Sequence, residues 1–246
     1  MTAGASPEGV RDEQEAARWV RAMFGRIAPR YDLLNHLLSL NLDRWWRART
    51  ARRLEPILRR PGARVLDVCC GSGDLLLALE ARRRGPVLGS DFCHPMLVVA
   101  RGKMERRQSR SVLFEADSLR LPVADRSLDL VTAAFGFRNL ASYERGLAEL
   151  LRVLKPGGAA AILEFSRPPN ALFRRSFEFC SRRILPAVGG VVSGAPDAYA
   201  YLPASIGKFP DAEGLAEAMR RAGFRDVAFE RMSWGVVALH IGVAGV

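Results

Sequence analysis

The stretch VLDVCCGSGDLLLALE, residues 65–80, decides the fold of this chain. A short apolar run is followed by a glycine turn at 71–73 and then by leucines spaced as on one side of a helix. The pattern predicts a strand over 63–69 and a helix over 73–82. A strand, a glycine turn and a helix in this order bind several nucleotide-type cofactors, so the stretch alone leaves the ligand open.

From residue 62 onward, apolar runs alternate with helical segments. Strands are expected at 63–69, 86–92, 111–117, 128–136 and 159–166, with a C-terminal pair at 224–233 and 235–245. Helices are expected at 73–82, from about 95, and at 143–154 before KPGG (155–158). Alternation of this kind favours an α/β fold, in which helices cover both faces of a mainly parallel sheet.

Two segments fall outside this alternation. Residues 17–60 are helical in pattern, with aromatic residues and leucines between arginines, and residues 167–210 are rich in Phe, Leu, Gly and Pro. We expect both to cover the carboxyl edge of the sheet, where open α/β sheets bind their ligands. Residues 1–15 are expected to be a disordered tail, and residues 16–246 a single domain.

The chain carries a net charge of +11, from 37 basic and 26 acidic residues. A solvated basic surface, attraction to anionic lipid head groups and attraction to nucleic acid all agree with this excess, and charge alone does not choose between them. No apolar run reaches the ~18 residues that span a bilayer, and the N-terminus lacks the apolar core of a secretory signal. We therefore expect a cytoplasmic protein.

Cysteines and histidines indicate neither disulfides nor a metal centre. The four cysteines, at 69, 70, 93 and 180, contain no CxxC pair, and the three histidines, at 36, 94 and 240, have no ligand partner at suitable spacing. We expect small buried thiols in a reducing compartment, a packed core position for His240, and no metal.

The glycine turn does not match the phosphate-binding motifs. GxxxxGK[ST] is absent, and GxGxxG is met only at its first two glycines because Leu76 takes the third position, which weakens NAD binding without excluding it. Asp67, at the end of the first strand, would repel a pyrophosphate. It would complement the ammonium group of S-adenosylmethionine, a cofactor without phosphate.

Two further acids lie where such a cofactor needs them. Asp91 ends the second predicted strand, eighteen residues after Gly73, where its carboxylate can accept both ribose hydroxyls. Asp117 ends the third predicted strand, where the adenine amino group would be read. Three acids at the ends of three successive strands therefore predict S-adenosylmethionine as the cofactor.

These residues resemble class I S-adenosylmethionine-dependent methyltransferases. The resemblance rests on VLDVCCGSG, SDF (90–92), FEADSLRLP (114–122), LDLV (128–131) and LRVLKPGG (151–158). From about residue 20 to the end, the chain is similar to one family, the ubiquinone/menaquinone biosynthesis C-methyltransferases. The specific matches are YDLLN (31–35), AFGFRNL (134–140), LEFSRP (163–168), YAYLPASIGKFP (199–210) and GVVALH (235–240).

The resemblance implies a Rossmann-like class I fold, with a seven-stranded, mostly parallel sheet and an antiparallel C-terminal pair. It implies C-methylation of a polyprenylated quinol, most directly demethylmenaquinol to menaquinol. The ubiquinone-pathway benzoquinol or another small molecule is the alternative acceptor. RNA methylation is a weaker alternative, because the arginine runs are scattered and no RNA-binding module is appended. A non-catalytic subunit is disfavoured by the intact turn and the acids.

Site residues are carried over by matching motif. The cofactor turn is Gly71, Ser72 and Gly73, the ribose ligand is Asp91, the adenine side is Asp117 and Ser118, and Phe92, Met96 and Ala134 are further cofactor contacts. Three positions depart from the family pattern, which often has methionine at Leu34, histidine at Asp43 and serine at Ala134. The change at Ala134 removes one polar contact to the cofactor.

Arg138 is the first candidate for catalysis. An arginine has a pKa above about 12 and is a poor base, so we expect it to stabilise a phenolate-like oxygen, with Asn139 as a hydrogen-bonding neighbour. Tyr31 and Asp32 are second candidates, and Asp32 either accepts a proton or pairs locally. The insertion is expected to line a tunnel for the isoprenoid tail. We further expect peripheral contact with an anionic membrane, no nucleic acid, and a homodimer on the resemblance alone.

Overall fold

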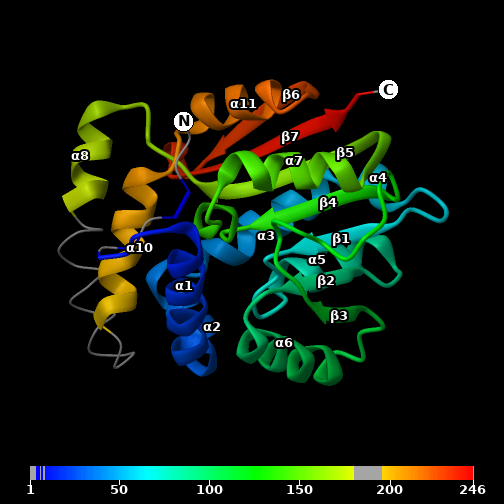
Figure 1. The fold of residues 1–246 in the computed structure, drawn as a ribbon, viewed down its shortest axis with the longest axis horizontal. Coiled ribbons are helices and arrows are strands. Elements are labelled where there is room, and N and C mark those ends of the chain that lie inside the picture. Colours follow the sequence, from blue (N-terminus) through cyan, green and yellow to red (C-terminus); the bar gives the residue numbers. More distant parts are fainter. Residues whose placement is uncertain (1–3, 6, 8, 180–195, 246) are drawn as a thin grey trace.

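The computed structural model describes residues 4–245 except 6, 8 and 180–195, and its centre is one seven-stranded sheet (Figure 1). The strands are β1 (Val65–Val68), β2 (Leu88–Asp91), β3 (Val112–Glu115), β4 (Leu128–Ala134), β5 (Leu154–Phe165), β6 (Phe224–Met232) and β7 (Val237–Ala244). Their order is β3-β2-β1-β4-β5-β7-β6. The pairs among β1–β5 are parallel, and β7 is antiparallel to both β5 and β6. The predicted fold class is confirmed.

The helices complete a three-layer arrangement. They are α1 (Glu13–Ile27), α2 (Tyr31–Leu38), α3 (Leu42–Arg53), α4 (Glu55–Leu58), α5 (Asp74–Arg83), α6 (His94–Arg106), α7 (Tyr143–Val153), α8 (Ala171–Phe179), α10 (Pro196–Lys208) and α11 (Ala212–Arg221), with single 3-10 turns η1 (Ala28–Arg30), η2 (Phe137–Asn139) and η4 (Ser233–Gly235). One hydrophobic cluster joins α7 and α11 to the sheet, and another joins α3, α4, α5 and the end of α6 to the opposite face.

Alternation along the central strands divides the core between these two faces. In β5, Ala160 and Ile162 belong to the cluster with α7 and α11, whereas Ala159, Ala161 and Leu163 belong to the cluster with α3, α4 and α5. Side chains of a strand point alternately to its two sides, so a strand buried on both faces is apolar throughout. This is why the run AAAIL could be predicted as a central strand.

Most strands are a few residues shorter than predicted, and the boundaries of β5 and β3 change the interpretation of a motif. β5 begins at Leu154, directly after α7, and not at residue 159. The register with β4 jumps from Leu128↔Leu154 to Leu130↔Ala159, so the KPGG residues form a bulge inside the strand. β3 ends at Glu115, which places Asp117 in the following turn rather than at the strand end.

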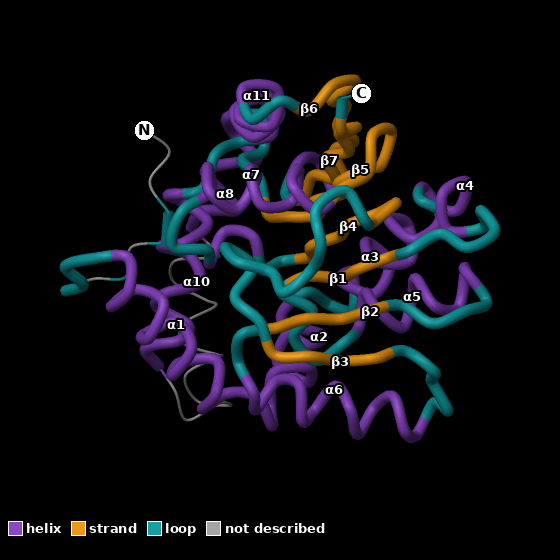
Figure 2. The backbone as a smooth tube through the Cα atoms, turned by 45° about the vertical axis from the view of Figure 1, so that its right-hand side comes forward, coloured by secondary structure: helices purple, strands orange, loops and turns teal. Residues whose placement is uncertain are grey.

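Helices α1, α8 and α10 lie beyond one end of the strands. Figures 1 and 2 both show α1, α8 and α10 grouped on the left of the sheet. Helix α1 contacts α6 and α10, while α3 packs on α5. The middle of the expected insertion cover, 180–195, lies outside the described residues. None of the described helices is long and apolar enough to cross a bilayer.

The segment expected to be a tail makes ordered contacts where the structure describes it. Helix α1 begins at Glu13, and Ala5 is buried and donates its backbone N–H to Leu140 O at 2.7 Å. Residues 1–3, 6 and 8 of the expected tail lie outside the described residues.

Candidate active site

A first cavity, of about 60 Å³, lies where the parallel strands β1 to β4 end. Its walls include the residues that follow these strands, and Phe24 and Tyr31 of the N-terminal helices close it from the other side. Of the predicted site residues, it is lined by Tyr31, Gly71, Asp91, Phe92, Met96, Asp117, Ser118, Ala134 and Asn139. These positions come from five separate segments of the chain, and the parallel sheet brings them to one edge.

The glycine turn and Asp91 form one hydrogen-bonded unit. Gly71 and Gly73 have φ of +55° and +85°, in the region that favours glycine. The Gly71 N–H donates to one carboxylate oxygen of Asp91 at 2.8 Å, and the Cys93 N–H donates to the other at 2.9 Å. Burial raises the pKa of Asp91 to about 6, although these two N–H groups lower it. The carboxylate is thus held at the cavity wall.

The first cavity suits a ligand that is neutral or cationic. Its described lining contains two acids, Asp91 and Asp117, and no lysine or arginine. A pyrophosphate here would face these acids without a counter-charge. The hydroxyls of a ribose and an amino-bearing base are matched by carboxylates. The residues therefore fit S-adenosylmethionine better than a dinucleotide.

Three predicted cofactor residues lie behind the cavity wall. Asp67 is buried in β1 and accepts a hydrogen bond from Thr132 Oγ1 at 2.6 Å. Burial raises its pKa to about 7. Gly73 caps α5, and the Ser72 hydroxyl points to the N-terminal helices instead. The structure does not bring these three into the lining of the first cavity.

A group of ion pairs ties helix α2 to the glycine turn. Asp32, on α2, accepts a hydrogen bond from the Ser72 hydroxyl. Lys103 Nζ, on α6, lies 2.7 Å from Asp32 Oδ2 and 3.1 Å from Ser72 Oγ, and it also pairs with Asp74. These contacts, which we call the α2 latch, place the predicted residues Asp32 and Ser72 between the cover and the turn.

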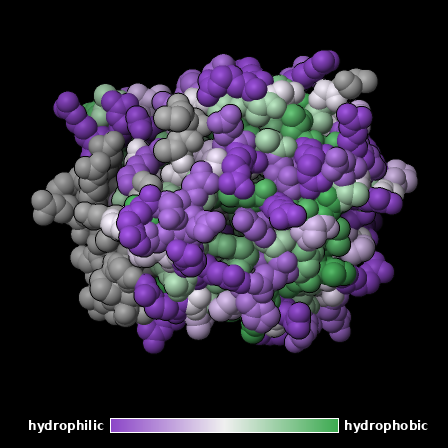
Figure 3. All heavy atoms as spheres, in the orientation of Figure 1, coloured by the Kyte–Doolittle hydropathy of each residue, from purple (hydrophilic) through white to green (hydrophobic). Residues whose placement is uncertain are grey.

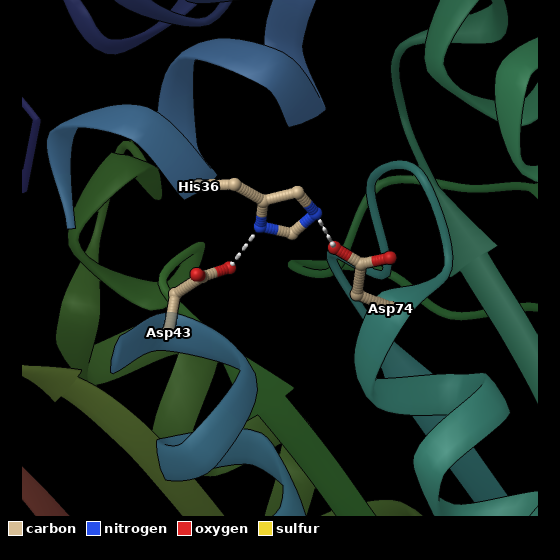
Figure 4. A group of neighbouring side chains, drawn as sticks. All are labelled: His36, Asp43 and Asp74. Carbon is tan, nitrogen blue, oxygen red and sulfur yellow. Dashed lines mark hydrogen bonds and ion pairs between the residues drawn. The ribbon is translucent and has the colours of Figure 1, made fainter. Parts of the chain in front are cut away.

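His36, Asp43 and Asp74 form the cluster drawn in Figure 4. His36 Nδ1 lies 2.9 Å from Asp43 Oδ2, and its Nε2 lies 4.0 Å from Asp74 Oδ2. The possible ligand atoms are within 4.8 Å of one another. However, Asp43 already pairs with Arg47 and Asp74 with Lys103, so each carboxylate has a cation. We interpret the cluster as an ion-pair network, and the absence of a metal stays a prediction.

A second cavity, of about 280 Å³, lies beside the first. Its lining is mainly aromatic and aliphatic, and includes Leu38, Leu40, Leu42, Trp46, Phe135, Phe165, Phe173, Phe177, Leu202, Ile206, Trp234 and Val236. Two buried arginines, Arg47 and Arg138, stand among these residues. Their guanidinium carbons lie 5.2 Å from the centre of the Phe135 ring and 5.3 Å from that of Phe165.

Arg138 is fixed by its buried partner Glu164. The Arg138 Nη1 lies 2.7 Å from Glu164 Oε1 and donates to Phe135 O at 2.5 Å, and Nε donates to Ser205 Oγ at 3.4 Å. Burial disfavours the charge, but Glu164 and nearby tyrosines more than offset it, so the pKa of Arg138 is raised. None of these hydrogen bonds to described residues uses Nη2. A permanent, oriented positive charge thus lines the second cavity.

The two cavities share a wall. Tyr31 and Phe135 line both, and Arg138 follows Phe135 by three residues. The loop that carries Phe135 packs tightly on the residue after β1, just before the glycine turn, because a Cβ on Gly136 would lie 2.4 Å from Cys69 Cβ. Asn139 lines the first cavity and accepts a hydrogen bond from the Tyr201 hydroxyl at 3.2 Å. A group in the second cavity can therefore meet a group in the first.

Sequence reasoning missed three of the residues that hold this site. Glu164 lies in the motif LEFSRP, where an acid inside an apolar strand was the available signal. Tyr201 lies in YAYLPASIGKFP (199–210), another segment that matches the family. Lys103 gave no signal, because an isolated lysine on a helix is ordinary and its partners lie on other elements.

Comparisons with known proteins agree with this geometry. Residues 10–244 match the model of the ubiE/COQ5 methyltransferase family. A demethylmenaquinone methyltransferase of Thermus thermophilus is 47% identical over 89% of this chain and 99% of its own length. A ubiquinone/menaquinone biosynthesis C-methyltransferase UbiE of Geobacter sulfurreducens is 41% identical over 94% of this chain and 90% of its own.

Among solved structures, a S-adenosylmethionine-dependent methyltransferase of Thermotoga maritima, described as a possible histamine N-methyltransferase, is similar in fold. Its TM-score is 0.65 at 18% identity, over 92% of this chain and 99% of that one. At this identity the likeness concerns the fold alone. The family match covers almost the whole chain, and with the relatives above it shows that this chain belongs to the ubiE/COQ5 methyltransferase family.

Proposed function

We propose that this enzyme transfers a methyl group from S-adenosylmethionine to a ring carbon of a polyprenylated quinol, with demethylmenaquinol as the principal acceptor. The observation that carries the proposal is the pair of cavities that share Tyr31 and Phe135. One cavity is lined by two acids and by Gly71 of the glycine turn, and the other is aromatic and contains two buried arginines. The naphthoquinol is favoured because the Thermus relative is named for demethylmenaquinone.

The cofactor residues in the proposal are those at the first cavity. Asp91 accepts the ribose hydroxyls, Asp117 and Ser118 read the base, and Phe92 and Met96 pack against it. Gly71 brings the backbone close, since a Cβ there would meet Met96 Cε at 3.3 Å. Gly73, Ser72 and Asp67 support the turn from behind. When bound, the cofactor supplies an electrophilic methyl group on a sulfonium.

The second cavity prepares the quinol. Its aromatic walls exclude water and hold the ring flat against the shared wall, and this positioning can account for roughly 7–11 kcal/mol of barrier lowering. As the ring hydroxyl loses its proton to a water molecule at the cavity opening, the neighbouring ring carbon becomes nucleophilic. Once this carbon carries the methyl group, its own proton leaves to water and the hydroxyl is protonated again, which restores the aromatic quinol. Arg138 stabilises the negative oxygen, because its charge is already oriented by Glu164 and works in a dry site.

The remaining candidates take supporting roles in the proposal. Tyr31 orders the acceptor at the shared wall, and Asn139, held by Tyr201, contributes a hydrogen bond from the neighbouring turn. Ala134 lines the first cavity without a polar group. Asp32 is engaged with Lys103 and Ser72, so we assign it to holding α2 on the turn rather than to accepting the proton.

We further propose that the enzyme works on the cytoplasmic side of the cell membrane, in peripheral contact with anionic lipid. Two features support this: the net charge of +11 and the polyprenyl tail of the proposed acceptor. A homodimer is carried forward on the family resemblance alone, and light scattering of the purified chain tests it.

The acceptor is tested with methyl-labelled S-adenosylmethionine and two short-tailed quinols, demethylmenaquinol and its benzoquinol counterpart. The expected result is a labelled naphthoquinol whose mass shows one added methyl on the ring. A labelled benzoquinol alone would move the function to the alternative suggested by the name of the Geobacter relative. Cofactor binding by calorimetry without methyl transfer to either quinol would overturn the proposal.

A further inference from the structure

Large apolar side chains that are exposed have an uneven distribution in this molecule. On the face drawn in Figure 3, apolar residues appear in small areas among hydrophilic ones, as on most protein surfaces. In the described part of the chain, however, the large apolar side chains that are exposed concentrate in two segments and a turn. They are Leu33, Leu37, Leu40, Leu42, Trp45, Leu172 and Trp234, and only Val98 and Val112 lie elsewhere.

Among the described residues, helix α2 presents the leucines of one side to solvent. Leu33 and Leu37 are four residues apart on α2, which places them on one side of the helix, and Leu40 follows in the turn beyond its end. The opposite side is used by the fold, since Leu34 is buried and Leu38 lines the second cavity. Packing therefore explains the inner leucines and leaves the outer ones unexplained.

The exposed residues border the opening of the second cavity. Leu40, Leu42 and Trp234 line this cavity, yet Leu40 and Trp234 are 80% and 81% exposed, so the cavity reaches the surface between them. Trp46 Nε1 donates to Ser233 Oγ at 2.9 Å, which brings α3 and the turn η4 together. The exposed side chains and the cavity lining thus form one continuous apolar surface.

Basic side chains are exposed on two helices that contribute to this cavity. Arg44 is exposed on α3 and Arg175 on α8. Between residues 28 and 49 the chain has two carboxylates, Asp32 and Asp43, and both are engaged inward, with Lys103 and Arg47. The surface that faces outward is therefore apolar with a positive border, which complements an anionic head-group layer over an acyl core.

We propose that this surface docks on an anionic bilayer with the second cavity opening onto the lipid. The docking face consists of Leu33, Leu37, Leu40, Leu42, Trp45 and Trp234. It is oriented so that the quinol ring enters the cavity while the polyprenyl tail stays among the acyl chains. This role of the docking face rests on the proposed function, whereas the contact with lipid can be measured without any acceptor.

The test uses the full chain and vesicles of phosphatidylglycerol and phosphatidylcholine in equal parts at low salt. The docking variant is L33S/L37S/W45S, whose residues are exposed and do not line either cavity. The matched control is V98S/V112S, because Val98 and Val112 are 58% and 56% exposed and lie outside the docking face. We expect the vesicle partition coefficient of the docking variant to fall about tenfold or more, and that of the control to stay within about twofold.

Measurements of methyl transfer distinguish the docking face from the proposed quinol methylation. On a short-tailed quinol in solution, the docking variant should match the wild type, and on a long-tailed quinol in vesicles its rate should fall in parallel with its partition. Equal vesicle binding by wild type and docking variant would overturn the docking face. A wild-type dimer that the docking variant converts to a monomer would also overturn it, since a second copy would then cover the surface. Vesicle binding that depends on the face, without turnover of any quinol, would support the docking face and contradict the proposed function.

Discussion

Arg138 is buried and stays protonated at ordinary pH, and its ion pair with Glu164 orients the guanidinium group. Its guanidinium is useful only if negative charge develops in the second cavity during the reaction. Replacement with methionine keeps much of the volume and removes the charge. Replacing Arg138 therefore tests the mechanism directly.

We expect Arg138→Met to lower kcat by about 10²–10³-fold, the effect of losing one oriented donor to a developing oxyanion. The dissociation constant for S-adenosylmethionine should not change, because Arg138 does not line the first cavity. Arg101→Met, at an exposed position, is the control. Steady-state kinetics and calorimetry provide the two readouts, and a wild-type kcat in Arg138→Met would contradict the mechanism.

Asp91 links cofactor affinity to pH. Burial raises its pKa to about 6 in the free protein, and only the ionised carboxylate accepts both ribose hydroxyls. Because the group becomes protonated as the pH falls through 6, the dissociation constant for S-adenosylmethionine should rise about tenfold between pH 7 and pH 5.

This dependence should disappear in Asp91→Asn, whose affinity is weak and flat with pH. Asp67→Asn should keep it, because Asp67 has a raised pKa as well but lies behind the cavity wall. Calorimetry at several pH values measures both variants. If the dissociation constant of Asp67→Asn does not change with pH and that of Asp91→Asn does, the titrating group is Asp67 and the prediction for Asp91 is wrong.

Between elements, the α2 latch joins α2 to the glycine turn and to α6. Lys103 on α6 neutralises Asp32 on α2 and Asp74 on α5, and all three side chains are mostly buried. Removal of the lysine leaves two carboxylates facing each other near Ser72. Helix α2, which carries Tyr31, then keeps the hydrogen bond between Asp32 and Ser72 but loses its ion pair with α6.

Lys103→Met is therefore expected to lower the free energy of unfolding by about 1–2 kcal/mol and to speed cofactor dissociation several-fold. Arg101→Met on the same helix controls for the loss of a charge at an exposed site. Chemical denaturation and stopped-flow displacement give the two values. If stability falls but the dissociation rate of the cofactor does not change, the latch serves folding alone.

The KPGG segment was predicted only in part from the sequence. KPGG correctly predicted the end of α7, because proline and glycine cannot continue a helix, but the same residues were wrongly kept outside the next strand. A bulge admits glycine and proline where a regular ladder does not. The Arg138–Glu164 pair could not be predicted either, since it depends on how β4 and β5 lie side by side.

For the whole molecule, the alternation of strands and helices was enough to predict the sheet, and of the three acids predicted at strand ends, two line the first cavity whereas Asp67 does not. Asp91 and Asp117 could be recognised because parallel strands all end at the same edge. The second cavity could not be predicted in detail. Its walls come from α2, α3, β5, α8, α10 and η4, and their approach is decided by packing and not by local pattern.

His240 gives a measurable property of the whole fold. It is buried in β7 with Nε2 2.8 Å from Ala212 O, and burial lowers its pKa to about 4. Since the unfolded value is about 6.5, the unfolded chain binds the proton more tightly. The stability is therefore complete above about pH 6.5 and is lost as the pH falls toward 4, by up to about 3 kcal/mol.

His240→Gln keeps a donor for Ala212 O and cannot titrate, so the difference in unfolding free energy between it and the wild type should shrink on acidification. Urea denaturation at pH 7 and pH 4.5 measures this difference. Asp67 and Asp91, whose pKa values are raised, stabilise the fold as the pH falls, but they are present in both proteins and cancel. A difference that is constant with pH would show that His240 is not the titrating group.

The shared wall formed by Tyr31 has a kinetic consequence. Tyr31 lies on α2 and lines both cavities, so we expect a bound quinol to hold α2 in place and to slow exchange of the nucleoside in the first cavity. Turnover should then follow a compulsory order, in which the sulfonium donor loads first, the methylated quinol departs next and the spent nucleoside leaves last. Product inhibition by that nucleoside would be competitive against the donor and mixed against the quinol.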